Sequence, residues 1–208
     1  MDVKAVYTDI DGTVTHGSSI FDLLRFDAGR RDQTRAGETF VAALTDAARA
    51  GTPRAVTNRR YFRWWAGRTV ADVDDTARAW LDRQRSDGGP WFVDTVADEI
   101  EAHLARGAHL VAVSASFPPA LAAVRTRWPG MSLLTTIAHV RDGRYTGTVE
   151  TPLVGQAKAD AVISHAQLHG VDLSEAVGYG DHASDLPFLR ILGSGYLVGQ
   201  RGCMVPVG

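Results

Sequence analysis

The sequence predicts an α/β fold in which a parallel sheet carries helices on both faces and a helical insertion follows the first strand. From about residue 95 onward, short apolar runs rich in β-branched residues alternate with segments of helical periodicity, a pattern typical of such sheets. A similar apolar run lies at the N-terminus, whereas residues 16–94 show helical patterns and no convincing strand. The 208 residues allow a core with a sizeable insertion. We therefore expect a catalytic core of residues 1–15 and 95–208 and a helical cap of residues 16–94.

The first expected strand, residues 3–8, ends in Asp9-Ile10-Asp11-Gly12-Thr13. Apolar residues at Val96, Ile100 and Leu104 have the spacing of an amphipathic helix. Asp142-Gly143 is a typical two-residue hairpin turn. The later elements are expected in this order: helix 94–107, strand 109–113, helix 117–128, strand 131–137, hairpin 140–148, helix 157–170, strand 175–179, helix 185–192 and strand 195–198.

The insertion is expected to contain helices at 36–50 and 61–85, with Gly51-Thr52-Pro53 and Gly88-Gly89-Pro90 as breaks. The second helix is rich in aromatic and basic residues. Helical spacing brings Tyr61, Trp64, Trp65 and Arg68 together, with Phe62 beside them. We favour the interpretation that the aromatic residues form the cap's own small core and the arginines are solvated. The alternative is that some of them roof an active site and select its leaving group.

Composition excludes several classes of protein. A formal net charge of −2 argues against a dedicated nucleic-acid binder. The single cysteine, Cys203, cannot form an internal disulfide, and no zinc-ligand set is visible. The N-terminus lacks the pattern of a secretory signal, and no apolar run approaches the length of a membrane helix. We expect a cytoplasmic protein with no nucleic-acid or membrane partner. Of 22 basic residues only Lys4 and Lys158 are lysine, which makes Lys158 in mid-chain notable.

Polar residues follow the strands where the strands end. Asp9 and Asp11 follow the first strand and point the same way because side chains in extended chain alternate. Ser114 follows the second strand, and Asp181 and Asp185 follow a later one. In open parallel sheets such loops gather at one edge. Clustered carboxylates repel one another unless a divalent cation lies among them, and hard oxygen ligands favour magnesium.

These groups suit phosphoryl transfer. Mg²⁺ and the Lys158 ammonium would offset the charge that repels an anionic nucleophile, while a hydroxyl and backbone amides would hold the other phosphoryl oxygens. A carboxylate could then attack phosphorus to form an aspartyl-phosphate. A second carboxylic acid two residues on could protonate the leaving oxygen and later take a proton from water.

Four motifs in this order resemble the haloacid dehalogenase superfamily, in its phosphoserine-phosphatase-like branch. They are Asp9-Ile10-Asp11-Gly12-Thr13-Val14, Leu110-Val111-Ala112-Val113-Ser114, Lys158 with the residues before it, and Gly180-Asp181-His182-Ala183-Ser184-Asp185. The resemblance implies a Rossmann-like three-layer α/β/α core. It also implies Asp9 as nucleophile and magnesium ligand and Asp11 as general acid/base with its backbone carbonyl on the metal. Asp181 and Asp185 would be further metal ligands, Lys158 would hold both Asp9 and the phosphoryl group, and the phosphate-binding set would be Thr13, Ser114, Ala115 and Lys158.

The resemblance predicts a magnesium-dependent phosphatase of a small phosphorylated metabolite. Ser114-Ala115-Ser116-Phe117 and Gly180-Asp181-His182-Ala183-Ser184-Asp185 depart from the Ser-Gly-Gly-Phe and Gly-Asp-Gly-Ala-Asn-Asp of phosphoserine phosphatases, which weakens phosphoserine as the substrate. A phosphotransferase with an alcohol acceptor, a phosphoserine phosphatase, and a non-catalytic phosphometabolite-binding regulator remain as alternatives.

Three other polar residues have two interpretations each. Backbone hydrogen bonding is the more common role for a residue such as His182, with catalysis as the alternative. His16 either faces substrate or lies at the surface, and Ser116 either joins the phosphate site or caps the next helix.

Overall fold

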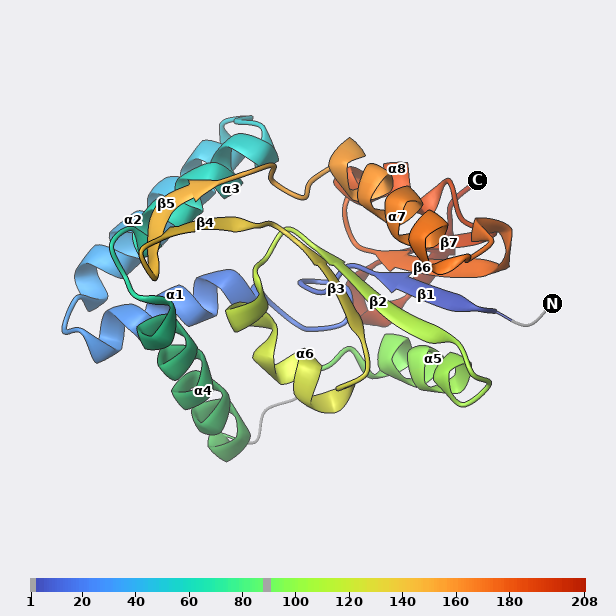
Figure 1. The fold of residues 1–208 in the computed structure, drawn as a ribbon, viewed down its shortest axis with the longest axis horizontal. Helices are drawn as coiled ribbons and strands as arrows, with labels where there is room; N and C mark the ends of the chain where they lie inside the picture. The colour runs from blue at the N-terminus through green and yellow to red at the C-terminus, as the bar shows by residue number, and fades with distance from the viewer. Residues whose placement is uncertain (1–2, 88–90) are drawn as a thin grey trace.

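The computed structural model describes residues 3–87 and 91–208 and has a central six-stranded sheet (Figure 1). The strand order is β3-β2-β1-β6-β7-β8, and every pair is parallel except β7–β8. The predicted α/β class is therefore confirmed. The strands are β1 Ala5–Thr8, β2 His109–Ser114, β3 Ser132–Thr135, β6 Ala176–Gly180, β7 Ser194–Val198 and β8 Met204–Pro206.

Alternate residues of the strands pack on opposite faces of the sheet. Val6 packs against α5 (Asp94–Leu104) and α6 (Ala122–Arg127). Tyr7 packs against α7 (Gln156–His169) and α8 (Leu186–Leu189). Figure 1 shows the two helical layers on either side of the sheet. Because both faces are covered, the strand interiors are mainly apolar, and polar side chains gather at the strand ends and in the loops that follow.

The cap helices are α1 (Ser19–Arg30), α2 (Thr34–Arg49), α3 (Arg54–Phe62) and α4 (Val70–Asp87), and they lie beyond one end of the sheet (Figure 1). Tyr61, Phe62 and Trp65 are at most 1% exposed, within an apolar cluster that the cap helices share. The aromatic residues are thus buried as the favoured interpretation expects, but the cluster also includes Phe117 and Ala120 of the core, and Tyr61 lines the cavity between cap and core, as the alternative expects. Arg68 differs from the solvated arginines expected, because it is paired with the buried Asp27 carboxylate.

The predicted hairpin forms a separate two-stranded sheet of β4 (Ala138–Arg141) and β5 (Arg144–Val149). Asp142 and Gly143 form its turn, both with positive φ, as a two-residue hairpin turn requires. The hairpin reaches out from the sheet to the cap helices (Figure 1), where Tyr145 and Val149 join the cap's apolar cluster. Residues 138–149 thus pack on the cap although they lie within the range expected for the core. The domain boundaries remain a prediction.

The prediction of a single helix over residues 61–85 is wrong. The chain instead forms α3, a 3-10 turn at Arg63–Trp65 and then α4, with a break at Gly67. Gly67 adopts φ +78°, and its amide donates to the Tyr145 carbonyl at 2.8 Å. Arg144 in turn donates to the Gly67 carbonyl at 2.8 Å. Contacts with the hairpin, which lies far away in sequence, therefore override the helical periodicity.

Smaller differences arise where helices are short or edges irregular. The sequence did not predict α1 or the antiparallel edge strand β8. The expected helix at 117–128 begins as a 3-10 turn at Pro118–Leu121, and the one at 185–192 is the short α8 preceded by a 3-10 turn at Ala183–Asp185. The expected break at Gly88-Gly89-Pro90 lies outside the described residues.

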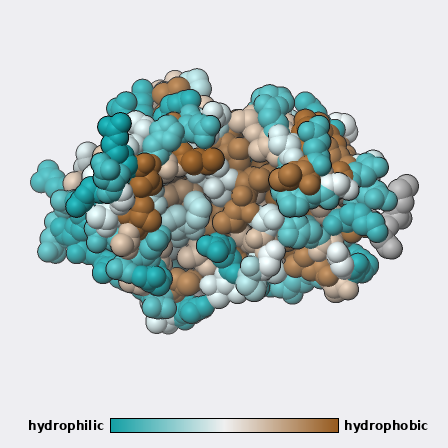
Figure 2. Space-filling model, viewed as in Figure 1, coloured by the Kyte–Doolittle hydropathy of each residue, from teal (hydrophilic) through white to brown (hydrophobic). Residues whose placement is uncertain are grey.

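Hydropathy varies across the molecular surface. In Figure 2 the two ends of the visible face are mainly hydrophilic, and hydrophobic side chains gather toward its middle. Across residues 3–87 and 91–208, no helix is both long and apolar enough to cross a membrane.

Candidate active site

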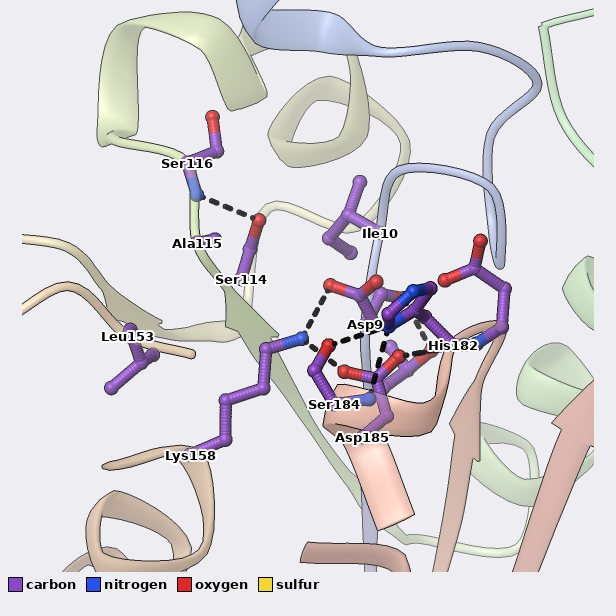
Figure 3. Close-up of polar contacts among 12 residues, drawn as sticks. Asp9, Ile10, Ser114, Ala115, Ser116, Leu153, Lys158, His182, Ser184 and Asp185 are labelled. Carbon is purple, nitrogen blue, oxygen red and sulfur yellow. Dashed lines mark hydrogen bonds and ion pairs between the residues drawn. The ribbon is translucent and has the colours of Figure 1, made fainter. Parts of the chain in front are cut away.

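A buried lysine joins two carboxylates at the end of the sheet nearest the cap. Asp9 follows β1, and its amide donates to the Tyr179 carbonyl of β6 at 2.9 Å. Lys158 lies in the first turn of α7 and is 3% exposed. Its Nζ lies 2.8 Å from Oδ1 of Asp9 and 2.7 Å from Oδ1 of Asp185 (Figure 3). Lys158 therefore fixes Asp9 relative to the loop after β6.

Asp185 is held from its other side by that same loop. Its Oδ2 accepts hydrogen bonds from the amides of Asp181 at 3.2 Å and His182 at 3.1 Å. The ring Nδ1 of His182 accepts the amide of Ser184 at 3.0 Å and caps the following 3-10 turn. His182 thus makes the backbone hydrogen bond expected as its more common role. Asp185, which is 1% exposed, is thus fixed in place and orients Lys158.

Three carboxylates converge at this point. Asp9, Asp181 and Asp185 each offer an oxygen, and these oxygens all lie within 4.8 Å of one another. Two glycines allow the close packing. A side chain at Gly12, whose φ is +85°, would collide with the Asp181 carboxylate. A Cβ at Gly180 would lie 2.6 Å from that of Asp185. The donor set is the all-oxygen type that Mg²⁺ prefers.

The electrostatics of the cluster reflect burial and crowding. Burial raises the pKa of Asp9 to about 6, although Lys158 acts in the opposite direction. Burial and the neighbouring Asp185 also raise the pKa of Asp181. Burial alone would lower the pKa of Lys158, but Asp9 and Asp185 outweigh it and hold that pKa above its usual value. The site therefore holds the Lys158 ammonium among several carboxylates and favours a further cation.

Asp11 faces the cap rather than this cluster. Its Oδ1 accepts the amide of Ser19 at 2.9 Å, where α1 begins. Burial raises the pKa of Asp11 to about 6, although the Ser19 hydrogen bond acts in the opposite direction. A carboxyl group with a pKa near neutrality can both give and take a proton in the physiological range. The metal contact expected of Asp11 was through its backbone carbonyl, and that expectation stays a prediction.

The loop after β2 is braced from two sides. The hydroxyl of Ser114 accepts the amide of Ser116 at 3.1 Å (Figure 3). The Ala115 carbonyl accepts Nδ2 of Asn58 at 2.8 Å and the hydroxyl of Thr136 at 2.9 Å. The hydroxyl of Ser116 is buried and has no hydrogen-bond partner among the described residues. A cap residue therefore helps to fix the loop expected to bind phosphate.

A cavity of about 560 Å³ lies between cap and core. Most of the predicted site residues line it: Asp9, Asp11, Ser114, Ala115, Lys158 and Asp181. Asp185 contacts Lys158 without lining the cavity. Thr13 is fully buried and does not line the cavity, so its predicted role in phosphate binding gains no support from this position. His16 is exposed and also lies outside the lining.

Sequence reasoning missed the cap residues that complete the site. Arg54 and Asn58 of α3 line the cavity, and Arg54 donates to the Ser184 hydroxyl at 3.3 Å. Neither residue belongs to a motif. The only local signal is their place in a polar helix after Gly51-Thr52-Pro53, which does not indicate which side faces the core.

Comparisons with known proteins agree with this geometry. The model of the haloacid dehalogenase-like hydrolase family matches residues 6–190. A probable phosphatase of Mycobacterium tuberculosis is 33% identical over 109 residues, which are 52% of this chain and 38% of that protein. The chain thus spans about two fifths of that relative's length. A phosphoserine phosphatase of Halobacterium salinarum is 28% identical over 189 residues, covering 89% of this chain and 81% of that protein.

Solved structures show the same fold. A Bordetella pertussis Tohama I protein of unknown function has a TM-score of 0.79 at 21% identity, covering 94% of this chain and 89% of that chain. A substrate-bound phosphoserine phosphatase has a TM-score of 0.67 at 20% identity, covering 94% of this chain and 85% of that chain. The family that the motifs predicted is therefore confirmed. The chain belongs to the haloacid dehalogenase-like hydrolase family.

Proposed function

We propose that this protein is a magnesium-dependent phosphatase that hydrolyses a small phosphate monoester through an aspartyl-phosphate on Asp9. The observation that carries the proposal is the placement of Lys158, 2.8 Å from Asp9 and 2.7 Å from Asp185, at the floor of a cavity that Asp11 and Asp181 also line. The family membership and the phosphatases among the relatives support it.

In the first half-reaction a carboxylate oxygen of Asp9 attacks phosphorus, and the bond from phosphorus to the ester oxygen breaks. Asp11, whose pKa burial raises to about 6, gives its proton to the leaving alcohol oxygen from its protonated form. Lys158 and Ser114 hold the phosphoryl oxygens, assisted by the amides of the loop that Asn58 and Thr136 brace.

In the second half-reaction the now anionic Asp11 takes a proton from water. The water oxygen attacks the phosphorus of the aspartyl-phosphate, the acyl-phosphate bond breaks, and Asp9 returns as carboxylate. An alcohol in place of water would make the protein a phosphotransferase. The residues at the site do not distinguish the two acceptors, so product analysis with added alcohols is the test between them.

The proposal includes a magnesium ion held by Asp9, Asp181 and Asp185, with the backbone carbonyl of Asp11 as a further ligand. These residues fit the ion, because their carboxylate oxygens converge within 4.8 Å and form a hard donor set. When bound, Mg²⁺ would offset the negative charge of the phosphoryl group and of the carboxylates. Small phosphorylated metabolites are the proposed substrates, and the cytoplasm is the proposed location.

The experiment is turnover of p-nitrophenyl phosphate by wild-type protein and by Asp9→Asn. The Asn side chain keeps the size of Asp but is a poor nucleophile, so we expect at least about a thousandfold loss of kcat. Chelation of divalent cations should abolish turnover by the wild-type protein, and added Mg²⁺ should restore that turnover. Thermal unfolding checks that Asp9→Asn is folded. Undiminished turnover in Asp9→Asn would refute the mechanism, and an inert but folded wild-type protein would favour the non-catalytic regulator.

A further inference from the structure

We propose that the ester's alcohol part is apolar and carries no amino group. The inference rests on the proposed function and concerns the cap side of the same cavity. This side consists of the start of α1, the second half of α2 and the first turns of α3. Ile20 and Phe21 of α1 and Leu44 and Ala48 of α2 give it an apolar surface. Tyr61 adds its ring, since its hydroxyl already donates to the Ile20 carbonyl at 3.0 Å.

The charges on the two sides of the cavity are unequal. Within the described residues, every carboxylate that lines the cavity belongs to the core side, namely Asp9, Asp11 and Asp181. The one charged residue that the cap contributes to the lining is Arg54, in the same described set. Asp22, an acidic residue of α1, does not line the cavity and lies 3.5 Å from the guanidinium of Arg25. The carboxylate of Asp22 lies close to the lining residue Gly17 but is paired with Arg25. Within the described residues, the cap's part of the lining therefore offers the leaving group a cation and no unpaired anion.

An ammonium group on the leaving alcohol would be poorly accommodated here. Transfer of a charged group from water into a site without an opposite charge is costly. Arg54 would repel it, and the core carboxylates are already engaged with Lys158, Ser19 and the proposed magnesium ion. Threonine hydroxyls at the cap, such as Thr45 and Thr57, are neutral and do not compensate its charge.

An apolar chain on the leaving group should bind favourably at the cap side of the cavity, where an ammonium group should bind poorly. Each methylene that leaves water strengthens binding by about fourfold. The cavity, at about 560 Å³, is within the range of sites for small organic molecules. The leaving group should therefore extend from Asp11 along Ile20, Phe21 and Leu44, away from Asp9 and Asp181.

The test compares two esters of nearly equal shape, propyl phosphate and phosphoethanolamine, which differ by a methyl in place of an ammonium. We expect kcat/KM for propyl phosphate to exceed that for phosphoethanolamine by at least about tenfold. In the series ethyl, propyl, butyl and pentyl phosphate, kcat/KM should rise by about two- to fourfold per methylene. O-Phospho-L-serine should behave like phosphoethanolamine.

The two esters differ in intrinsic reactivity. The preference ratio, kcat/KM for propyl phosphate divided by kcat/KM for phosphoethanolamine, is therefore compared between the wild-type protein and variants of α2, in which that reactivity is the same. Ala48 is exposed and lines the cavity, so Ala48→Glu adds a carboxylate there at little cost to folding. We expect it to lower the preference for propyl phosphate by about fivefold. Ala48→Gln, which has nearly the same size, and Ala42→Glu, on the same helix outside the cavity, should leave the ratio unchanged.

The outcomes separate this inference from the proposed function. If Asp9→Asn is inert but the wild-type protein prefers phosphoethanolamine or phosphoserine to propyl phosphate, the inference is wrong and the proposed function stands. An Ala48→Glu ratio equal to that of wild type would also overturn it. If the wild-type protein cleaves no phosphate ester, both fail.

Discussion

Lys158 is one of two lysines among 22 basic residues, and it lies where a compact cation is needed. Its ammonium fits between Asp9 and Asp185 at 2.8 and 2.7 Å, and its side chain is 3% exposed. A guanidinium is larger and planar, and its donors form a fixed fork. Asp9 and Asp185 are themselves buried and hold the ammonium closely, and the group faces the cavity where the phosphoryl group is proposed to bind, so a guanidinium would take up part of that space.

We therefore expect Lys158→Arg to lower kcat/KM for an aryl phosphate by about a hundredfold or more, in the range that follows loss of one group that stabilises transition-state charge. Steady-state kinetics on the purified variant is the measurement. Lys4→Arg is the matched control, because Lys4 is exposed and lies just before β1. Equal activity of Lys158→Arg and wild type would show that charge alone matters at this position.

The site residues differ in how well the sequence predicts them. Asp9, Ser114, Asp181 and Lys158 belong to ordered motifs, and parallel strands bring their ends to one edge of the sheet. Asn58 and Arg54 reach the same cavity from a cap helix, and their position depends on how that helix packs on the core. Thr13 shares a motif with Asp9 but is buried outside the cavity lining, since the turn after Ile10 folds it inward.

At the scale of elements, local periodicity predicts most of the core and fails in the cap. The strands of the sheet are mainly apolar runs, and neighbouring strands satisfy their backbone hydrogen bonds. The break at Gly67 depends instead on a hydrogen bond to Tyr145, a residue far along the chain. The helix α1 is hard to recognise because its buried side includes a carboxylate, Asp27, beside Leu23 and Leu24.

Asp27 ties α1 to the rest of the cap. Its side chain is fully buried, accepts Nε1 of Trp64 at 2.8 Å, and pairs with Arg68 and Arg31. Asp27→Asn would leave Arg68 without its counter-charge, so we expect the free energy of unfolding to fall by about 3 kcal/mol or more. Denaturant unfolding measures the change.

Asp46→Asn is the control for that prediction. Asp46 and its partner Arg49 are both more than 70% exposed, so this substitution should cost less than about 1 kcal/mol. Equal losses in the two variants would mean that the buried network adds nothing beyond a surface pair.

At the scale of the whole molecule, the cavity lies where the cap helices meet the loops at the end of the sheet. The sheet with its two helical layers supplies the carboxylates and Lys158, and the cap helices α1, α2 and α3 supply the opposite side. The sequence predicts the parallel sheet and the insertion. It does not predict that the hairpin packs on the cap, because that placement depends on contacts of Tyr145 and Val149 with residues distant in sequence.

Covalent capture of the intermediate tests the central claim, that Asp9 takes the phosphoryl group. Wild-type protein turning over p-nitrophenyl phosphate is quenched rapidly in acid, and the modified peptide is identified by mass spectrometry. We expect one phosphoryl group on Asp9, with none on Asp9→Asn treated in the same way. The initial burst of p-nitrophenol should have the same rate as the formation of phosphorylated Asp9. A phosphoryl group on another residue, or steady turnover by wild-type protein with no modified peptide at any quench time, would contradict the account.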